Sequence, residues 1–174
     1  MRKTSTTLEI AQIAIAVATI IVGGYAILIL SSPLAIPGVK YIMMAPYLSM
    51  VLIILINRVK SKFVIIKANV VFAMLMSFIN LYMGLAIILS GVLTQALNIS
   101  LIKDNRWTRG ITCSGYAGFV LLTALPISKH LIGGVVFEQI TIKWIFVAAG
   151  IAFLFGIAGS LFGEFISKRI GNIT

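Results

Sequence analysis

The chain contains few of the residues that catalysis and metal binding need. Among 174 residues there are four acidic residues, one cysteine and one histidine. The lone Cys113 excludes an internal disulfide and a cysteine-only metal cage, so we expect it to pack as a small apolar residue. His130 lies in a polar stretch without a partner histidine, which is typical of a surface residue. We therefore expect no metal site and no cofactor.

Motifs for nucleotide or zinc chemistry are also missing. The chain has no GxxxxGK[ST] phosphate loop, no HExxH pair and no paired carboxylates within an apolar run. We therefore expect no catalytic residues and no ATP hydrolysis by the chain itself. Ionisable residues inside membrane spans mark ion and proton paths, and their scarcity here argues against an autonomous proton-coupled pump.

Apolar residues, in contrast, are abundant: 60% of the chain is hydrophobic and only 10% is charged. A membrane-spanning helix needs about 20 apolar residues. The sequence contains six such segments, at about 9–30, 41–57, 63–79, 81–102, 110–128 and 140–167. It therefore predicts an all-α polytopic membrane protein with six transmembrane helices in a single domain over residues 1–174.

The cations predict how these helices are oriented. Three lysines, Lys40, Lys129 and Lys143, fall on one side of a six-span arrangement. The other side receives Arg2, Lys3, Arg58, Lys60, Lys62, Lys67, Lys103, Arg106, Arg109, Lys168 and Arg169. The positive-inside rule then places both termini in the cytoplasm. The net charge of +10 thus indicates topology and attraction to the lipid bilayer. We expect no nucleic-acid partner, because the cations are divided among four segments.

A row of alanines and a proline-rich loop dominate the first part of the chain. Ala11, Ala14 and Ala18 recur at i, i+3 and i+7 and share one helical face. Small faces let helices approach closely in lipid, so we interpret this face as a docking surface. The alternative is that it packs inside the six-helix bundle. The loop at residues 31–40, with Pro33, Pro37 and Gly38, should have a defined shape and is interpreted as a lid.

Close helix packing is predicted at two further places. Gly159 and Gly163 form a GxxxG spacing in the last apolar segment, which should pack tightly there. Pro46 should kink the second segment towards a cavity or a neighbour. Gln95, in the fourth segment, is expected to hydrogen-bond to a neighbouring helix.

Polar and aromatic side chains gather at the predicted outer side. A tight turn is expected at residues 77–82, which would bring its side chains beside the first loop. The candidate substrate-binding residues are Lys40, Tyr41, Asn80, Tyr82, Glu138, Gln139, Lys143 and Trp144. Pockets are mostly apolar with a few orienting polar groups. Lys143 either extends to lipid phosphate or faces the cavity, where it could pair with Glu138 or neutralise an acidic ligand.

With these residues assembled, the chain resembles the substrate-binding S components of energy-coupling factor (ECF) transporters. The likeness rests on six apolar segments, on Ala14-xxx-Ala18, and on the first loop LAIPGVKYIMMAPY. KSKF and LSGVLTQALNISLI are similar to a poorly characterised branch of that superfamily. The amino-terminal Met-His of the nickel and cobalt branch is absent, since Arg2 follows Met1.

The resemblance implies a membrane subunit of an ABC-type importer, in the cell membrane of a prokaryote. Ala14 and Ala18 would contact a transmembrane coupling subunit, which works with two ATPase subunits. The small-molecule substrate would be a micronutrient, a vitamin or vitamin precursor in preference to a metal ion. Two alternatives stay open: a structural scaffold of the cell envelope related to cell shape, and an accessory subunit of a membrane prenyl-synthesis system.

Overall fold

The computed structural model describes residues 6–34, 36–59, 61–101, 105–133 and 140–171, and this part of the chain is all helical. The helices, in chain order, are α1 (Thr6–Leu30), α2 (Val39–Arg58), α3 (Val64–Ser77), α4 (Leu81–Ser100), α5 (Arg106–Ile127), the π-helical turn η1 (Ser128–Ile132) and α7 (Ile142–Gly171).

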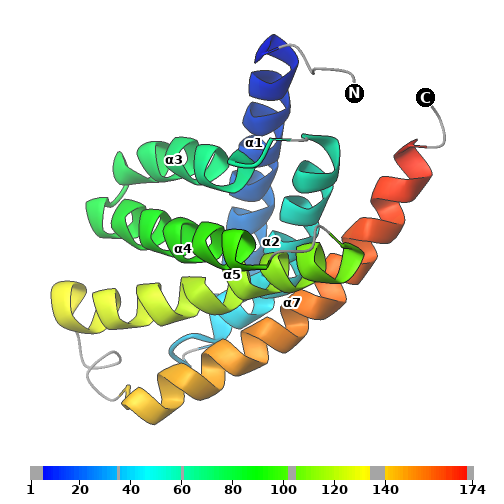
Figure 1. Ribbon diagram of the computed structural model, residues 1–174. Helices are drawn as coiled ribbons and strands as arrows, with labels where there is room; N and C mark the ends of the chain where they lie inside the picture. The colour runs from blue at the N-terminus through cyan, green and yellow to red at the C-terminus, as the bar shows by residue number, and fades with distance from the viewer. Residues whose placement is uncertain (1–5, 35, 60, 102–104, 134–139, 172–174) are drawn as a thin grey trace.

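The helices form a bundle in which α3, α4 and α5 lie side by side and α2 packs against both α5 and α7 (Figure 1). α1 packs against α2 and α3 and diverges from the α4–α5 pair. Two groups of buried side chains hold the bundle together. The larger joins α1, α2 and α3 around Val17, Leu52 and Ile65, and the smaller joins α2, α5 and α7 around Leu121 and Ala148.

Five helices are long and apolar enough to cross a membrane: α1, α2, α4, α5 extended through η1, and α7. Large apolar side chains such as Val22, Met74 and Leu154 lie exposed on the outside of the bundle. Such a surface would be a liability in water and is expected against lipid. The fold is therefore compatible with a multi-pass membrane protein.

The third predicted span is shorter than expected. The sequence predicts it at residues 63–79, but α3 has 14 residues, or about 21 Å of helix, against a hydrocarbon core of about 30 Å. The helix starts after Phe63 and gives way to the turn at Phe78, both apolar residues that hydropathy cannot distinguish from the helix interior. Six apolar helices are present in the described residues, and five of them have the full length of a span.

The two turns that the sequence predicts, at residues 31–40 and 77–82, have defined shapes. The turn at 77–82 is confirmed: α3 ends at Ser77, and the Asn80 side chain caps α4 by accepting a hydrogen bond from the Tyr82 N–H at 2.9 Å. In the first loop, Gly38 adopts φ 87°, a conformation that favours glycine, and α2 starts directly after it.

The start of α5 differs from the expectation. The sequence suggests a span beginning near residue 110 after a polar loop, yet α5 starts at Arg106. The reason is a capping box between Asn105 and Thr108. The Thr108 hydroxyl accepts a hydrogen bond from the Asn105 N–H at 2.9 Å, and the Asn105 side chain accepts one in return from the Thr108 N–H. Arg106 and Arg109 therefore stand on the first turn of a helix.

The predicted close packing of the last segment is confirmed. Gly159 faces the backbone of Pro46, and Gly163 faces the backbone of Met50, so α7 lies directly on α2. Gln95 was expected to bond to a neighbouring helix, but its amide nitrogen donates to the carbonyl of Lys62, in the turn that precedes α3, at 3.0 Å. Cys113 is fully buried, as predicted for a small apolar residue.

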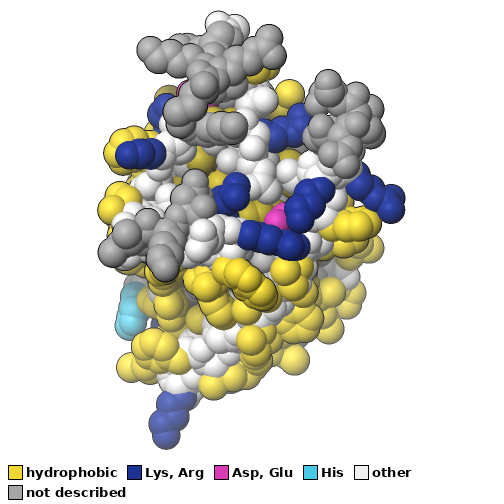
Figure 2. All heavy atoms as spheres, turned by 45° about the vertical axis from the view of Figure 1, so that its right-hand side comes forward, with side chains coloured by type: hydrophobic (Ala, Val, Ile, Leu, Met, Phe, Trp, Pro, Cys, Tyr) yellow, Lys and Arg dark blue, Asp and Glu magenta, His cyan; other side chains and the backbone are white. Residues whose placement is uncertain are grey.

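Basic side chains gather at one end of the bundle, which we call the basic end and define by Arg58, Lys67, Arg106, Arg109 and Lys168. Figure 2 shows Lys and Arg side chains grouped around an acidic side chain, with a broad hydrophobic surface next to them. The first turn of α1 and the last turns of α7 lie at this end (Figure 1). This grouping agrees with the charge asymmetry that the sequence predicts.

Candidate functional site

A cavity of about 180 Å³ lies between α2, α3, α4 and α5, towards the end of the bundle opposite the basic end. Leu28 at the end of α1 closes one side of it. Its apolar lining includes Met44, Leu48, Phe72, Met83, Ile87 and Val120. Its polar lining consists of Tyr41, Asn80, Tyr82, Ser90, Tyr116 and Ser128. Within the described part of the chain no charged residue lines it, so these residues form an apolar chamber with polar groups at two levels.

The deeper level, which we call the floor, is formed by Ser90 and Tyr116 and supported by Asn69. The Tyr116 hydroxyl donates to the Asn69 side-chain oxygen at 2.7 Å, and the Asn69 amide donates to the Ile65 carbonyl at 2.9 Å. Gly91 allows α4 to approach Asn69, since a Cβ there would lie 2.7 Å from the Asn69 Cβ. All three side chains are at most 3% exposed. The floor is thus held by one hydrogen bond from α5 to α3 and a second within α3 that orients the Asn69 amide.

The shallower level, which we call the rim, is formed by Tyr41, Asn80, Tyr82 and Ser128. These residues stand at the start of α2, in the α3–α4 turn, at the start of α4 and at the start of η1, directly after α5. Tyr41 lies within hydrogen-bonding reach of Ser128, which connects α2 to α5. Helix termini supply the rim because three chain segments begin or end at the same level of the bundle.

The structure brings together three of the eight predicted substrate-binding residues. Tyr41, Asn80 and Tyr82 line the cavity. Lys40, the neighbour of Tyr41 in the chain, is partly exposed and does not line the cavity. Lys143 is exposed at the start of α7 and also lies outside the lining.

Of the other three predicted residues, the structure describes Trp144 alone and places it outside the cavity lining. The Trp144 indole N–H donates to the Pro37 carbonyl at 3.0 Å, so Trp144 fastens the first loop to α7. Its ring packs with the buried group around Leu121. Glu138 and Gln139 lie outside the described residues.

Ser90, Tyr116 and Asn69 were not anticipated as site residues. The signal for them is a hydroxyl or amide in the middle of an otherwise apolar segment, where it needs a partner. That signal alone cannot show which of them meet, since they come from three different helices.

A second surface lies on α1, at the predicted alanine row. Ala11, Ala14 and Ala18 are all exposed and do not pack inside the described bundle. Ala14 also lines a shallow groove of about 440 Å³ between α1 and α3. The groove is otherwise lined by Ile10, Ile13, Ile66, Lys67, Val70 and Val71. At its edge, the Lys67 ammonium pairs with Glu9 at 2.7 Å, which ties α3 to α1.

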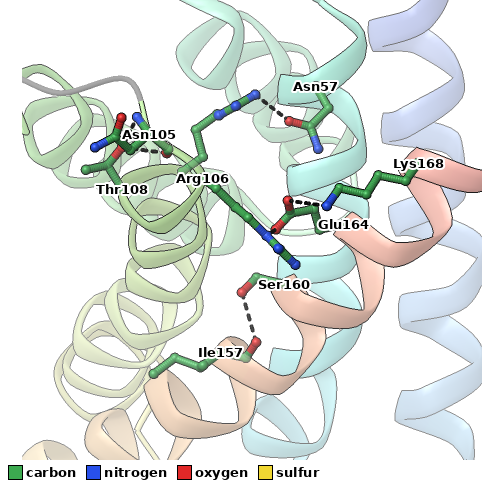
Figure 3. Close-up of polar contacts among 9 residues, drawn as sticks. Asn57, Asn105, Arg106, Thr108, Ile157, Ser160, Glu164 and Lys168 are labelled. Carbon is green, nitrogen blue, oxygen red and sulfur yellow. Dashed lines mark hydrogen bonds and ion pairs between the residues drawn. The ribbon is translucent and has the colours of Figure 1, made fainter. Parts of the chain in front are cut away.

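At the basic end, one carboxylate organises the contact between α5 and α7 (Figure 3). Glu164 pairs with Arg106 at 2.5 Å and with Lys168 at 3.7 Å. Beside it, the Arg109 guanidinium donates to the Asn57 side-chain oxygen at 2.7 Å and so ties α5 to α2. These contacts join the ends of three helices, which indicates a structural role.

The described residues contain no group of three side chains that could hold a metal ion. Comparison of the chain with protein-family models, with curated proteins and with solved structures gives no match. The case for function therefore depends on the cavity and on the exposed alanine face.

Proposed function

We propose that this protein is the membrane-embedded substrate-capture subunit of an ECF-type ABC importer. It takes up a small micronutrient, a vitamin or a vitamin precursor, across the cell membrane of a prokaryote. In this role the cavity receives the molecule from outside, and a transmembrane coupling subunit with two ATPase subunits supplies the energy. The basic end faces the cytoplasm, in keeping with the positive-inside rule.

The observation that carries the proposal is the exposed alanine face on α1. A helix inside a finished bundle would bury its small residues, because close backbone approach is what they provide in lipid. Here Ala14 and Ala18 remain uncovered, and Ala14 borders an apolar groove. A partner helix could lie along this face without displacing any described element. The ligand-sized cavity in the same small protein supports capture as the task that such a partner would serve.

Assembly with the coupling subunit tests the proposal. The protein is co-expressed with the coupling subunit and paired ATPases of its host, and the complex is isolated through a tag on an ATPase. Ala14→Trp and Ala18→Trp should abolish recovery of this protein while leaving its folding unchanged, since tryptophan adds more volume than a close helix contact can absorb.

Ala158→Trp is the matched control, because Ala158 is also an exposed alanine but lies on α7. It should leave recovery intact. If all three variants assemble as well as the unsubstituted protein, the alanine face is not the docking surface. If the unsubstituted protein never assembles with the ATPases, the importer role is wrong. A role as an envelope scaffold would then take its place.

A further inference from the structure

We propose that the cavity binds an uncharged, ring-sized molecule that presents a hydrogen-bond donor to Ser90 and Tyr116. This inference rests on the capture role proposed above and names the class of molecule that is captured. It differs from the anionic ligand that Lys143 suggests in the sequence.

The absence of charge around the cavity is the first step. Among the described residues, no lysine, arginine, aspartate or glutamate lines the cavity. The Lys129 ammonium, next to the rim residue Ser128, is directed at the Ile140 carbonyl. A carboxylate or phosphate brought to this depth would lose its water and gain no cation in return, which is very costly. A cationic ligand would likewise find no carboxylate among the described lining residues. The cavity therefore favours an uncharged molecule.

The size of the cavity is the second step. An apolar protein cavity of about 150 Å³ holds one benzene molecule. The cavity here measures about 180 Å³, and Phe72 and Tyr116 contribute aromatic rings to it. A single substituted ring fits this space, and aromatic neighbours favour it. Larger substituents would extend towards the rim.

The hydrogen bonds at the floor are the third step. The Tyr116 hydroxyl already donates its proton to Asn69. The Ser90 hydroxyl donates to the Ile87 carbonyl at 2.9 Å, and it also lies within hydrogen-bonding reach of the Tyr116 oxygen. With either partner, the Ser90 proton is used inside the protein. What remains at the floor is lone pairs, and these accept hydrogen bonds.

An acceptor-only floor selects the polar group of the ligand. A hydroxyl or ring N–H would satisfy the lone pairs of Ser90 and Tyr116. A carbonyl or ether oxygen at the same place would face lone pairs and stay unpaired, which costs binding free energy. The rim is less selective, because the Asn80 amide and the hydroxyls of Tyr41 and Tyr82 can both donate and accept. The floor thus sets the class of ligand, and the rim tolerates variation.

Three matched probes test the proposal by fluorine NMR on the full-length protein in lipid nanodiscs at pH 7. They are 4-fluorophenol, an uncharged donor; 4-fluorotoluene, of similar shape without a donor; and 4-fluorobenzoate, an anion. Empty nanodiscs correct for partition into lipid. We expect 4-fluorophenol to bind about three- to tenfold more tightly than 4-fluorotoluene, which is the usual effect of one hydrogen bond. Benzoate should show no saturable binding.

Two serine variants locate the effect. Ser90→Ala should weaken the binding of 4-fluorophenol and leave the binding of 4-fluorotoluene unchanged. Ser160→Ala is its matched control: Ser160 is also buried and donates to a carbonyl three residues earlier at 2.9 Å, but it lies outside the cavity lining. Ser160→Ala should change the binding of neither probe. Ala86→Leu or, if that variant does not fold, Ala124→Leu should fill the cavity and abolish binding of both probes.

Binding of benzoate as tight as that of phenol overturns the proposal, as does phenol binding that survives a folded cavity-filling variant. The absence of saturable binding by all three probes overturns it as well. None of these results changes the assembly measured with Ala14→Trp. Failure of the ligand class can therefore be separated from failure of the importer role.

Discussion

Gly159 of α7 lies so close to Pro46 of α2 that a Cβ added to the glycine would overlap the Pro46 carbonyl group. Pro46 cannot donate a hydrogen bond to the preceding turn, so the helix already has an irregularity at this point. The glycine fits directly against it, and α2 and α7 are fixed to each other there. This contact positions Tyr41 and Met44 at the cavity, since both belong to the first turns of α2.

Substitution of Gly159 tests how much this contact contributes. Gly159→Ala should lower the free energy of unfolding by about 1–3 kcal/mol, because backbone atoms on the opposite helix cannot move aside cheaply. Gly150→Ala is the matched control on the same helix, since nothing lies within 4 Å of its added Cβ. It should be neutral or stabilising by up to about 1 kcal/mol. Reversible denaturation in mixed micelles measures both, and equal effects would contradict the packing described.

Removal of the Tyr116 hydroxyl should also be costly. In Tyr116→Phe the buried Asn69 oxygen loses its donor, and an unsatisfied buried polar group costs about 1–3 kcal/mol. Tyr47→Phe is the comparison: the Tyr47 hydroxyl donates to the Thr19 carbonyl at 2.5 Å, at an exposed site. Its loss should cost less than about 1 kcal/mol. Thermal unfolding in ligand-free micelles ranks the two, and the reverse order would show that the floor is hydrated.

Part of the candidate site could be predicted from the sequence. Tyr41 and Tyr82 were identified because they follow the turn residues Gly38 and Asn80, which place them at one end of the bundle. Asn80 was identified as part of its turn. The turn at residues 77–82 followed from the same chemistry. The GxxxG spacing predicted tight packing of α7, although not that Pro46 and Met50 would be its partners.

The floor and Lys143 show where sequence reasoning stops. Asn69, Ser90 and Tyr116 meet only because α3, α4 and α5 are rotated to face one another, and hydropathy carries no information on rotation within a uniformly apolar helix. Lys143 is the second residue of α7, and a position along a helix does not tell which way a side chain faces. The structure leaves it exposed and outside the cavity lining.

Lys143 is therefore expected to be dispensable for ligand binding. Lys143→Met should leave the dissociation constant of 4-fluorophenol unchanged, because Lys143 is exposed and does not line the cavity. The measurement is the same fluorine NMR titration. A weakening of more than tenfold would show that Lys143 reaches the ligand, and would restore the anionic class of substrate that the sequence suggests.

The carboxylate of Glu164 should stabilise the basic end only modestly. The Glu164 side chain is 13% exposed, but its partners Arg106 and Lys168 are 55% and 62% exposed. Ion pairs that solvent reaches in this way contribute about 0.2–1 kcal/mol. Glu164→Gln should therefore lower the free energy of unfolding by an amount in this range. The loss should shrink as salt is raised, because ions screen exposed pairs. A salt-independent loss would indicate that Glu164 acts through packing.

Orientation in the membrane can be tested with single cysteines. Cys113 is fully buried, so it should be silent towards an impermeant thiol reagent, and Cys113→Ala provides a clean background. In intact cells Ser32→Cys, in the exposed first loop, should react, whereas Ser167→Cys, near the end of α7, should react only after the cells are opened. The positive-inside rule gives this result because the cations concentrate at the basic end. Labelling of both positions in intact cells would contradict an arrangement with the basic end in the cytoplasm, and the cavity would then face the wrong compartment for uptake.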